Sequence, residues 1–145
     1  PAPRGGLILA GKDLRLRIEH LAVWSEDIER LRAFYETYFA ARAGKKYTNP
    51  NTGFQSYFLS FADGPRLEIM QAPDVLPAGP YANNRITGLA HFAVAVGSEA
   101  AVDALTARLA ADGFAVAGPP RRTGDGYYES VILDPDQNRV EITAG

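Results

Sequence analysis

Hydrophobic and polar positions follow two periods along the chain, and the same order of periods occurs twice. A period of two predicts a half-buried strand, and a period of three to four predicts an amphipathic helix. The elements expected in the first half are a strand at 14–24, a helix of about 14 residues capped by Ser25 and ending near Gly44, a weak strand at 46–48, and strands at 54–61 and 66–70. The elements expected in the second half are a strand at 89–96, a helix capped by Ser98 and closed by Asp112 and Gly113, a strand at 114–117, a loop at 119–126, and strands at 127–133 and 139–143.

The two halves also match residue by residue, which indicates an internal duplication. At an offset of 73 positions the aligned pairs are Gly53 with Gly126, Asp63 with Asp136, Arg66 with Arg139, Glu68 with Glu141 and Ile69 with Ile142. The only histidines, His20 and His91, lie 71 positions apart in similar apolar runs. We therefore expect an α+β fold of two tandem βαβββ modules at about 14–72 and 86–143. A proline-rich linker at 73–85 joins them into a single domain, 1–145.

Strand alternation places one histidine and one glutamate of each module on the sheet face that points away from the helix. These are His20 and Glu68 in the first module and His91 and Glu141 in the second. If the two modules curl into one cup, all four side chains converge. Two imidazoles and two carboxylates suit a divalent transition metal such as Ni, Co or Zn, with Fe or Mn as further candidates. The plainer alternative is that each glutamate pairs with the arginine two residues before it on the same face.

Composition excludes several classes of function. The chain has no cysteine, which excludes disulfides, thiolate metal ligands, iron–sulfur clusters and cysteine nucleophiles. Fifteen basic against seventeen acidic residues give a net charge of −2, so nothing indicates a nucleic-acid partner. No apolar stretch approaches the length of a membrane span, and the run at 7–10 is too short for a signal peptide. We expect a cytoplasmic protein with a small-molecule substrate and neither a nucleic-acid nor a membrane partner.

The motifs resemble those of the vicinal oxygen chelate superfamily, which includes glyoxalase I, the extradiol dioxygenases and the bleomycin resistance proteins. The resemblance covers about residues 14–143, and its motifs lie at 18–23, 66–69, 91–94 and 134–142. The last motif has the form D-P-D-x-x-x-x-E, which is quite specific to the superfamily. The resemblance implies a cupped mixed sheet and a homodimer, with the cup closed either within one chain or by exchange of modules between two.

The ligand set resembles bacterial glyoxalase I most, which uses His, Glu, His and Glu. His20, Glu68, His91 and Glu141 fall on those four positions. The resemblance implies a metal-dependent, lactoylglutathione lyase-like isomerisation of a small 2-oxoaldehyde–thiol adduct through a metal-stabilised enediolate. In this hypothesis Glu141 is the base, and Glu68 is a ligand that can share that role.

Two positions depart from bacterial glyoxalase I, which carries an Arg four residues after the first His and an Asn four after the first Glu, both used on glutathione. Here those positions are Trp24 and Ala72, so a different substrate is expected. Trp24 is interpreted either as an aromatic wall of the site or as plain core packing. Tyr128 and Ser130 are interpreted either as substrate contacts or as parts of a packed sheet surface.

Two other functions stay open from the sequence alone. The shared fold and the aromatic residues near the cup are compatible with an Fe(II) extradiol-type dioxygenase acting on a catechol-like substrate. A non-catalytic, small-molecule-binding protein of the bleomycin resistance type is the third hypothesis. It ranks last because such proteins usually lack the His/Glu set that this chain retains.

Overall fold

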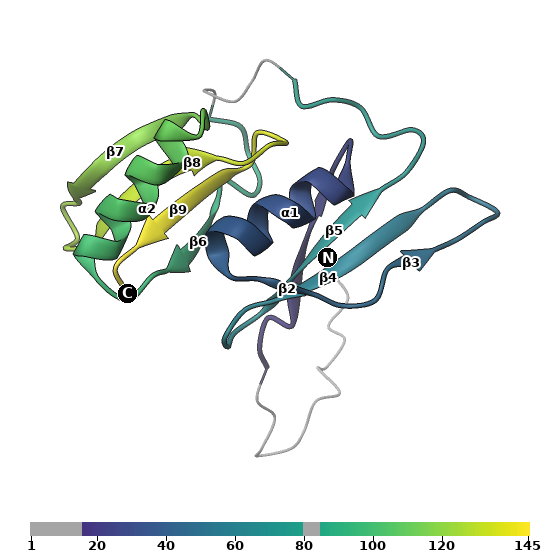
Figure 1. The fold of residues 1–145 in the computed structure, drawn as a ribbon, viewed down its shortest axis with the longest axis horizontal. Coiled ribbons are helices and arrows are strands. Elements are labelled where there is room, and N and C mark those ends of the chain that lie inside the picture. The colour runs from purple at the N-terminus through teal and green to yellow at the C-terminus, as the bar shows by residue number, and fades with distance from the viewer. Residues whose placement is uncertain (1–15, 80–84) are drawn as a thin grey trace, which may run out of the picture.

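The computed structural model describes residues 16–79 and 85–145 and contains two β-sheets, each accompanied by a helix (Figure 1). The elements of the first half are β1 (His20–Trp24), α1 (Ile28–Phe39), β2 (Arg42–Ala43), β3 (Tyr47–Thr48), β4 (Gln55–Ser60) and β5 (Arg66–Gln71). Those of the second half are β6 (Phe92–Ala95), α2 (Glu99–Ala111), β7 (Val116–Arg122), β8 (Tyr128–Leu133) and β9 (Arg139–Thr143). The α+β class is confirmed. Residues 14–15 of the expected first strand and 80–84 of the expected linker lie outside the described residues.

Both sheets have the same strand order and the same mixture of directions. The first has the order β1-β5-β4-β2, with β3 also paired to β4, and the second has the order β6-β9-β8-β7. In each sheet the first and last strands of the half are parallel, and the other pairs are antiparallel. The parallel register aligns Ala22 with Glu68 and Ala93 with Glu141. Two mixed sheets of like topology are what the sequence repeat predicts.

Helix α1 differs from the prediction at both ends. Asp27, rather than Ser25, is the N-cap, and its carboxylate accepts hydrogen bonds from backbone N–H groups of the first turn. Ser25 is buried, and its hydroxyl donates to Asp136 of the second half at 2.6 Å. The helix ends at Ala40, which adopts the left-handed conformation at φ 51°, well before Gly44. The hydroxyl of Ser25, which the local pattern predicts to cap the helix, therefore bonds to a residue of the other half instead.

Strand β7 runs through part of the segment that the sequence predicts to be a loop. It lies at the edge of the second sheet, and its pairing with β8 contains two register shifts. Pro119 and Pro120 are tolerated in it because an edge strand with bulges does not need every backbone N–H. The second helix follows its prediction more closely, since Ser98 caps it and Asp112 and Gly113 close it.

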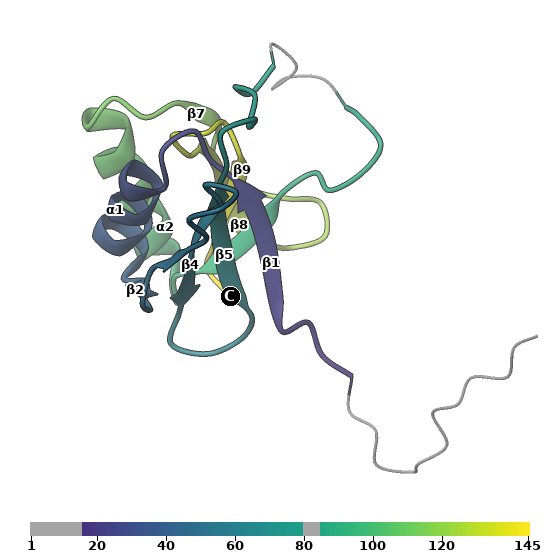
Figure 2. The ribbon, with the colours of Figure 1, turned by 90° about the vertical axis from the view of Figure 1, so that its right-hand side faces the viewer.

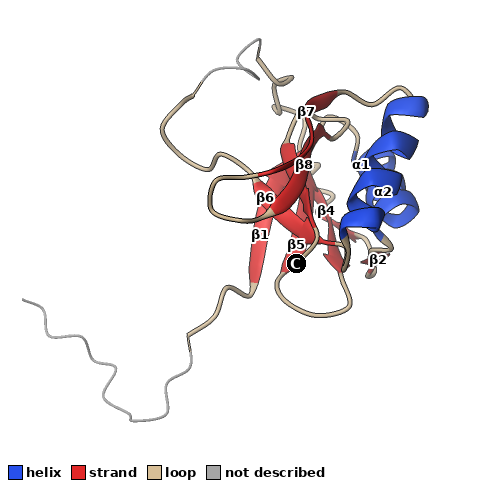
Figure 3. Ribbon diagram, turned by 90° about the vertical axis from the view of Figure 1, so that its left-hand side faces the viewer, coloured by secondary structure: helices blue, strands red, loops and turns tan. Residues whose placement is uncertain are grey.

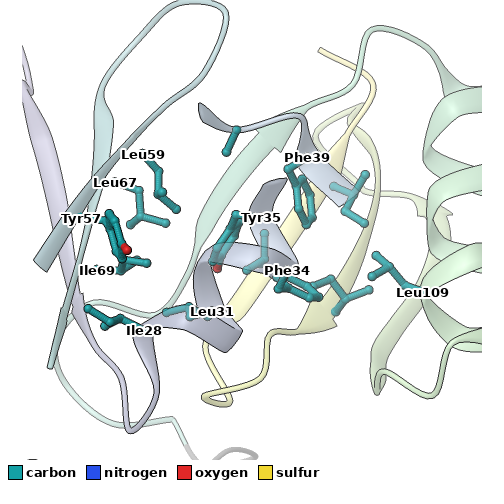
Figure 4. Close-up of a cluster of buried hydrophobic side chains, with 14 of the residues drawn as sticks. Ile28, Leu31, Phe34, Tyr35, Phe39, Tyr57, Leu59, Leu67, Ile69 and Leu109 are labelled. Atoms are coloured by element: carbon teal, nitrogen blue, oxygen red, sulfur yellow. The ribbon is translucent and has the colours of Figure 1, made fainter. Parts of the chain in front are cut away.

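Helix α1 lies against both halves and contributes to a core that they share (Figure 4). Its buried side chains are Ile28, Leu31, Phe34, Tyr35 and Phe39. The ring of Phe34 lies 4.9 Å from that of Phe114 in the second half. The hydroxyl of Tyr35 donates to the buried carboxylate of Asp134 at 2.6 Å. Burial raises the pKa of Tyr35 well above its usual range, so this hydroxyl remains a donor.

Both helices lie on the same side of the sheets, and the opposite face carries no helix among the described residues (Figure 2 and Figure 3). Strands β1 and β6 are terminal in their sheets. A cleft of about 700 Å³ is lined by residues of both halves, among them Leu21, Phe39, Phe92 and Val94. Neither helix is both long and apolar enough to cross a membrane. The face without helices is the one on which strand alternation places the histidines and glutamates named from the sequence.

Candidate metal centre

Each sheet presents one histidine beside one glutamate on its open face. In the first sheet, Nε2 of His20 lies 3.6 Å from Oε2 of Glu68. In the second, Nε2 of His91 lies 3.1 Å from Oε1 of Glu141. The carboxylate side chains are only 15% and 17% exposed, whereas the imidazoles are 41% and 43% exposed. The sheet thus shields each carboxylate and leaves the neighbouring ring open to a ligand.

The two pairs do not come together within one chain. Throughout residues 16–79 and 85–145, no three His, Asp or Glu side chains are grouped closely enough to hold a metal ion. The four side chains named from the sequence are therefore not grouped within one chain, and a cup closed between two chains, which the sequence left open, stays a prediction. In the single chain the two sheets lie side by side, and each His–Glu pair lies on the open face of its own sheet (Figure 1).

The donor atoms of both pairs nevertheless fit a divalent transition metal. In each pair an imidazole Nε2 faces a carboxylate oxygen, and such N,O sets are typical ligands of Zn, Ni and Co. The arginine–glutamate ion pairs considered from the sequence are not formed. Arg66 bonds Glu19 instead, and within the described part of the chain Glu68 and Glu141 form ion pairs only with histidine.

Glu19 contacts the histidine of the first pair, and nothing in the sequence pattern indicated this contact. Its Oε2 lies 2.5 Å from Nδ1 of His20, and its Oε1 accepts a hydrogen bond from Nε of Arg66 at 2.7 Å. The hydrogen bond with His20 lowers the pKa of Glu19, and Arg66 lowers it further. Strand alternation gives no signal for this residue, because neighbours along a strand are assigned to opposite faces.

A further carboxylate lies beside the second pair. Glu129 of β8 shares the open face with Glu141, since the register aligns Glu129 with Thr143 and Val131 with Glu141. Burial and the neighbouring Glu141 carboxylate raise the pKa of Glu129, while Arg121 acts in the opposite direction. The sequence analysis missed Glu129 because it singled out the residues on either side of it.

Those two residues, Tyr128 and Ser130, lie on the helix-facing side of β8. The hydroxyl of Tyr128 donates to Asp103 of α2 at 2.7 Å. The hydroxyl of Ser130 is fully buried and hydrogen-bonds Thr106 of α2 at 2.7 Å. Both hydroxyls are therefore engaged by α2, as the alternative of a packed sheet surface describes, and a substrate contact of either residue is not tested by this structure.

Trp24 lies on the open face at the end of the strand that carries His20. It is aligned with Met70 of β5, and its indole is 52% exposed. Its ring meets Phe54 edge-on, with 6.2 Å between ring centroids, and Phe54 in turn lies 6.0 Å from Tyr47. This exposure rules out plain core packing and leaves an aromatic surface next to the first His–Glu pair.

The sequence model of the Glyoxalase/Bleomycin resistance protein/Dioxygenase superfamily matches residues 17–142. The chain belongs to this superfamily. It is 29% identical over 130 residues to the uncharacterized protein YqjT of Bacillus subtilis, covering 88% of this chain and 98% of that protein. It is also 30% identical over 128 residues to the uncharacterized protein PA2024 of Pseudomonas aeruginosa, covering 88% of each. The family resemblance of the sequence motifs is confirmed.

Solved structures share the fold. Glyoxalase I from Zea mays is similar with a TM-score of 0.72 and 21% identity, covering 89% of this chain but only 44% of the maize chain. The trypanothione-dependent glyoxalase I of Leishmania major has a TM-score of 0.70 and 18% identity, covering 89% and 86% of the two chains. A glyoxalase/bleomycin resistance protein/dioxygenase domain from a Frankia species has a TM-score of 0.75 and 17% identity, covering 91% and 99%. These likenesses show that the chain shares the mixed α+β fold of these structures.

Proposed function

We propose that this protein is a metal-dependent isomerase or lyase of the glyoxalase type, acting on an adduct of a small 2-oxoaldehyde and a thiol. One observation carries the proposal: His20–Glu68 and His91–Glu141 form equivalent pairs on the open faces of equivalent sheets. Together they provide two nitrogen and two oxygen ligands. Such a set favours Ni, Co or Zn and leaves positions for a substrate.

The proposed active form is a homodimer, because one chain holds the ligands as two separated halves. A two-fold symmetric dimer pairs the first half of each chain with the second half of the other. Each of its two sites would then contain His20 and Glu68 together with the partner's His91 and the partner's Glu141. The open faces and the terminal strands β1 and β6 provide unpaired surfaces for this association.

In the proposed reaction a carboxylate moves one proton between neighbouring carbons of the substrate. Glu141 takes the proton from the carbon that carries the hydroxyl and the sulfur, and returns it to the adjacent carbonyl carbon. The hydroxyl proton moves to the second oxygen, so the product is a 2-hydroxy thioester with the same atoms as the adduct. The bound metal supplies positive charge where negative charge develops on substrate oxygen. Glu68 can share the role of proton carrier.

Metal binding is the first test of this function. After removal of metal with a chelator and reloading, the protein is expected to retain about one Ni, Co or Zn per chain, because each dimer provides two four-ligand sites. Elemental analysis after exhaustive dialysis measures this ratio. A chain that retains no transition metal contradicts the proposal. Iron, with oxygen uptake on catechols, would instead indicate the dioxygenase alternative.

Mixing two metal-deficient variants tests whether the site is shared between chains. The first variant is His20→Ala/Glu68→Ala, and the second is His91→Ala/Glu141→Ala. Each alone destroys half of every site, but a heterodimer of the two contains one intact site. After unfolding together and refolding, about one quarter of the wild-type metal content should return, because half of the dimers are mixed and half of their sites are complete.

The control for this experiment is mixing each variant with itself under the same conditions, which should restore nothing. Equal metal content in the mixed and the self-mixed samples would show that the ligands of one site do not come from two chains. Sedimentation of the wild-type protein at the mass of one chain would contradict the dimer directly.

Trp24 supports a substrate other than a glutathione adduct. Trp24 occupies the position at which bacterial glyoxalase I carries an arginine. Together with Phe54 it forms an apolar, planar surface. We propose that this surface contacts an apolar or aromatic part of the adduct. The substrate class is then a 2-oxoaldehyde adduct with an apolar group on the aldehyde or on the thiol.

Trp24 also provides its own reporter, since it is the only tryptophan of the chain. Its fluorescence is expected to change when the metal-loaded protein binds a thiol adduct of phenylglyoxal, and less when it binds the same adduct of methylglyoxal. In the variant Trp24→Ala, KM for the phenylglyoxal adduct should rise about 10-fold, since an aromatic contact contributes about 1–2 kcal/mol. Tyr127→Ala, which removes an aromatic ring that is also 52% exposed, is the matched control. Equal effects of the two variants would contradict the role of Trp24.

A further inference from the structure

We propose that Glu19 is a positioning residue that fixes the ring of His20, with Nδ1 protonated and Nε2 free for the metal. This inference rests on the proposed metal site. Glu19 contacts Nδ1 of His20 at 2.5 Å, while the opposite ring nitrogen points to Glu68. A carboxylate can only accept a hydrogen bond, so the shared proton belongs to the Nδ1 side of the neutral ring. Carboxylates in this position orient histidine ligands and raise their basicity.

Glu19 is itself held in place by three contacts with Arg66. The guanidinium donates through Nε at 2.7 Å and lies within 2.5 Å through Nη2, and the backbone N–H of Arg66 donates to the carbonyl oxygen of Glu19 at 2.9 Å. The guanidinium in turn lies over the ring of Phe58, 4.1 Å from its centroid. The ring of Phe58 meets that of His20 edge-on at 5.3 Å. His20 is thus fixed by a bonded carboxylate on one side and an aromatic ring on another.

The second half of the chain lacks this arrangement, which provides an internal comparison. Ala90 stands before His91 where Glu19 stands before His20, so that no carboxylate is available from this position. Among the hydrogen bonds of the described residues, none reaches Nδ1 of His91. The two histidines therefore differ in how firmly the ring is set. The first pair, His20 with Glu68, is the preorganised half of the proposed site.

The tautomer of His20 tests this role without metal and without substrate. The chain has only two histidines, so nitrogen NMR of the metal-free protein labelled in its imidazoles gives two ring systems, assigned with His20→Gln and His91→Gln. The neutral ring of His20 should carry its proton on Nδ1, and the neutral ring of His91 should not show this preference. In Glu19→Ala the His20 signals should move toward those of His91, while the His91 signals stay unchanged. Glu36→Ala, which removes an exposed glutamate of α1, should change neither ring.

Metal affinity gives the second readout. Competition with a chelating indicator should show Zn²⁺ binding about 10- to 100-fold weaker in Glu19→Ala than in the wild type or in Glu36→Ala. An unchanged His20 tautomer in Glu19→Ala overturns the role of Glu19, even if the protein binds metal. A wild-type protein that binds no metal overturns the proposed function, and the tautomer still decides whether Glu19 orients His20. The two failures are therefore distinguishable.

Discussion

Replacing Glu141 with glutamine is expected to lower kcat by about 10²- to 10⁴-fold, because it removes the proposed proton carrier. Glutamine keeps the size and the oxygen of the side chain but cannot take a proton from carbon near neutral pH. The change should leave the fold intact, since Glu141 lies on the open face and its only ion-pair partner among the described residues is His91. Formation of the 2-hydroxy thioester by metal-reloaded protein measures the loss.

Two companion variants separate loss of the base from loss of the metal. Glu68→Gln should lower both the metal content and the turnover, because the proposal assigns Glu68 mainly to the metal. Glu36→Gln, on the exposed side of α1, should change neither quantity. Wild-type turnover in Glu141→Gln, measured at equal metal content, would contradict the assignment of the base and with it the glyoxalase-type mechanism.

The sequence predicted the components of the site because those depend on local geometry. Alternation along β1, β5 and β9 sets which side chains point away from the helices, and the parallel register then places a histidine near a glutamate in each half. The pattern along β8 did not decide between the two interpretations of Tyr128 and Ser130. Three consecutive residues of β8, Ser130 to Ile132, are buried, so the apolar pattern does not show which face is which.

Features that depend on tertiary packing could not be predicted from the sequence. The separation of the two His–Glu pairs depends on how the two sheets are arranged in one chain, and no motif of the chain specifies this. The bond of Ser25 to Asp136 and the bond of Glu19 to Arg66 are of the same kind. In both cases a polar side chain forms a hydrogen bond with a residue that is distant in the sequence, and the local sequence pattern does not identify that residue.

The contact between the two halves that we expect to matter most for stability is made by Asp134. Its buried carboxylate accepts hydrogen bonds from the hydroxyl of Tyr35 at 2.6 Å, from the side chain of Asn138 at 2.9 Å, and from the backbone N–H groups of Asp136 and Asn138. Replacing it with alanine leaves these donors without their acceptor. We expect Asp134→Ala to lower the free energy of unfolding by about 3 kcal/mol, because each buried unsatisfied donor costs about 1–3 kcal/mol.

Urea unfolding of four proteins tests this contact as a double-mutant cycle. Tyr35→Phe alone should cost about 1–2 kcal/mol, and the double variant should lose less than the sum, because it no longer buries a hydroxyl without a partner. Asp63→Ala, which removes an exposed carboxylate, should change the free energy of unfolding by less than about 0.5 kcal/mol. Additive losses would contradict a direct Tyr35–Asp134 contact. Because the core shared by the two halves remains in Asp134→Ala, this variant should still unfold in one transition like the wild type. Two separate transitions would show that the halves unfold independently of each other.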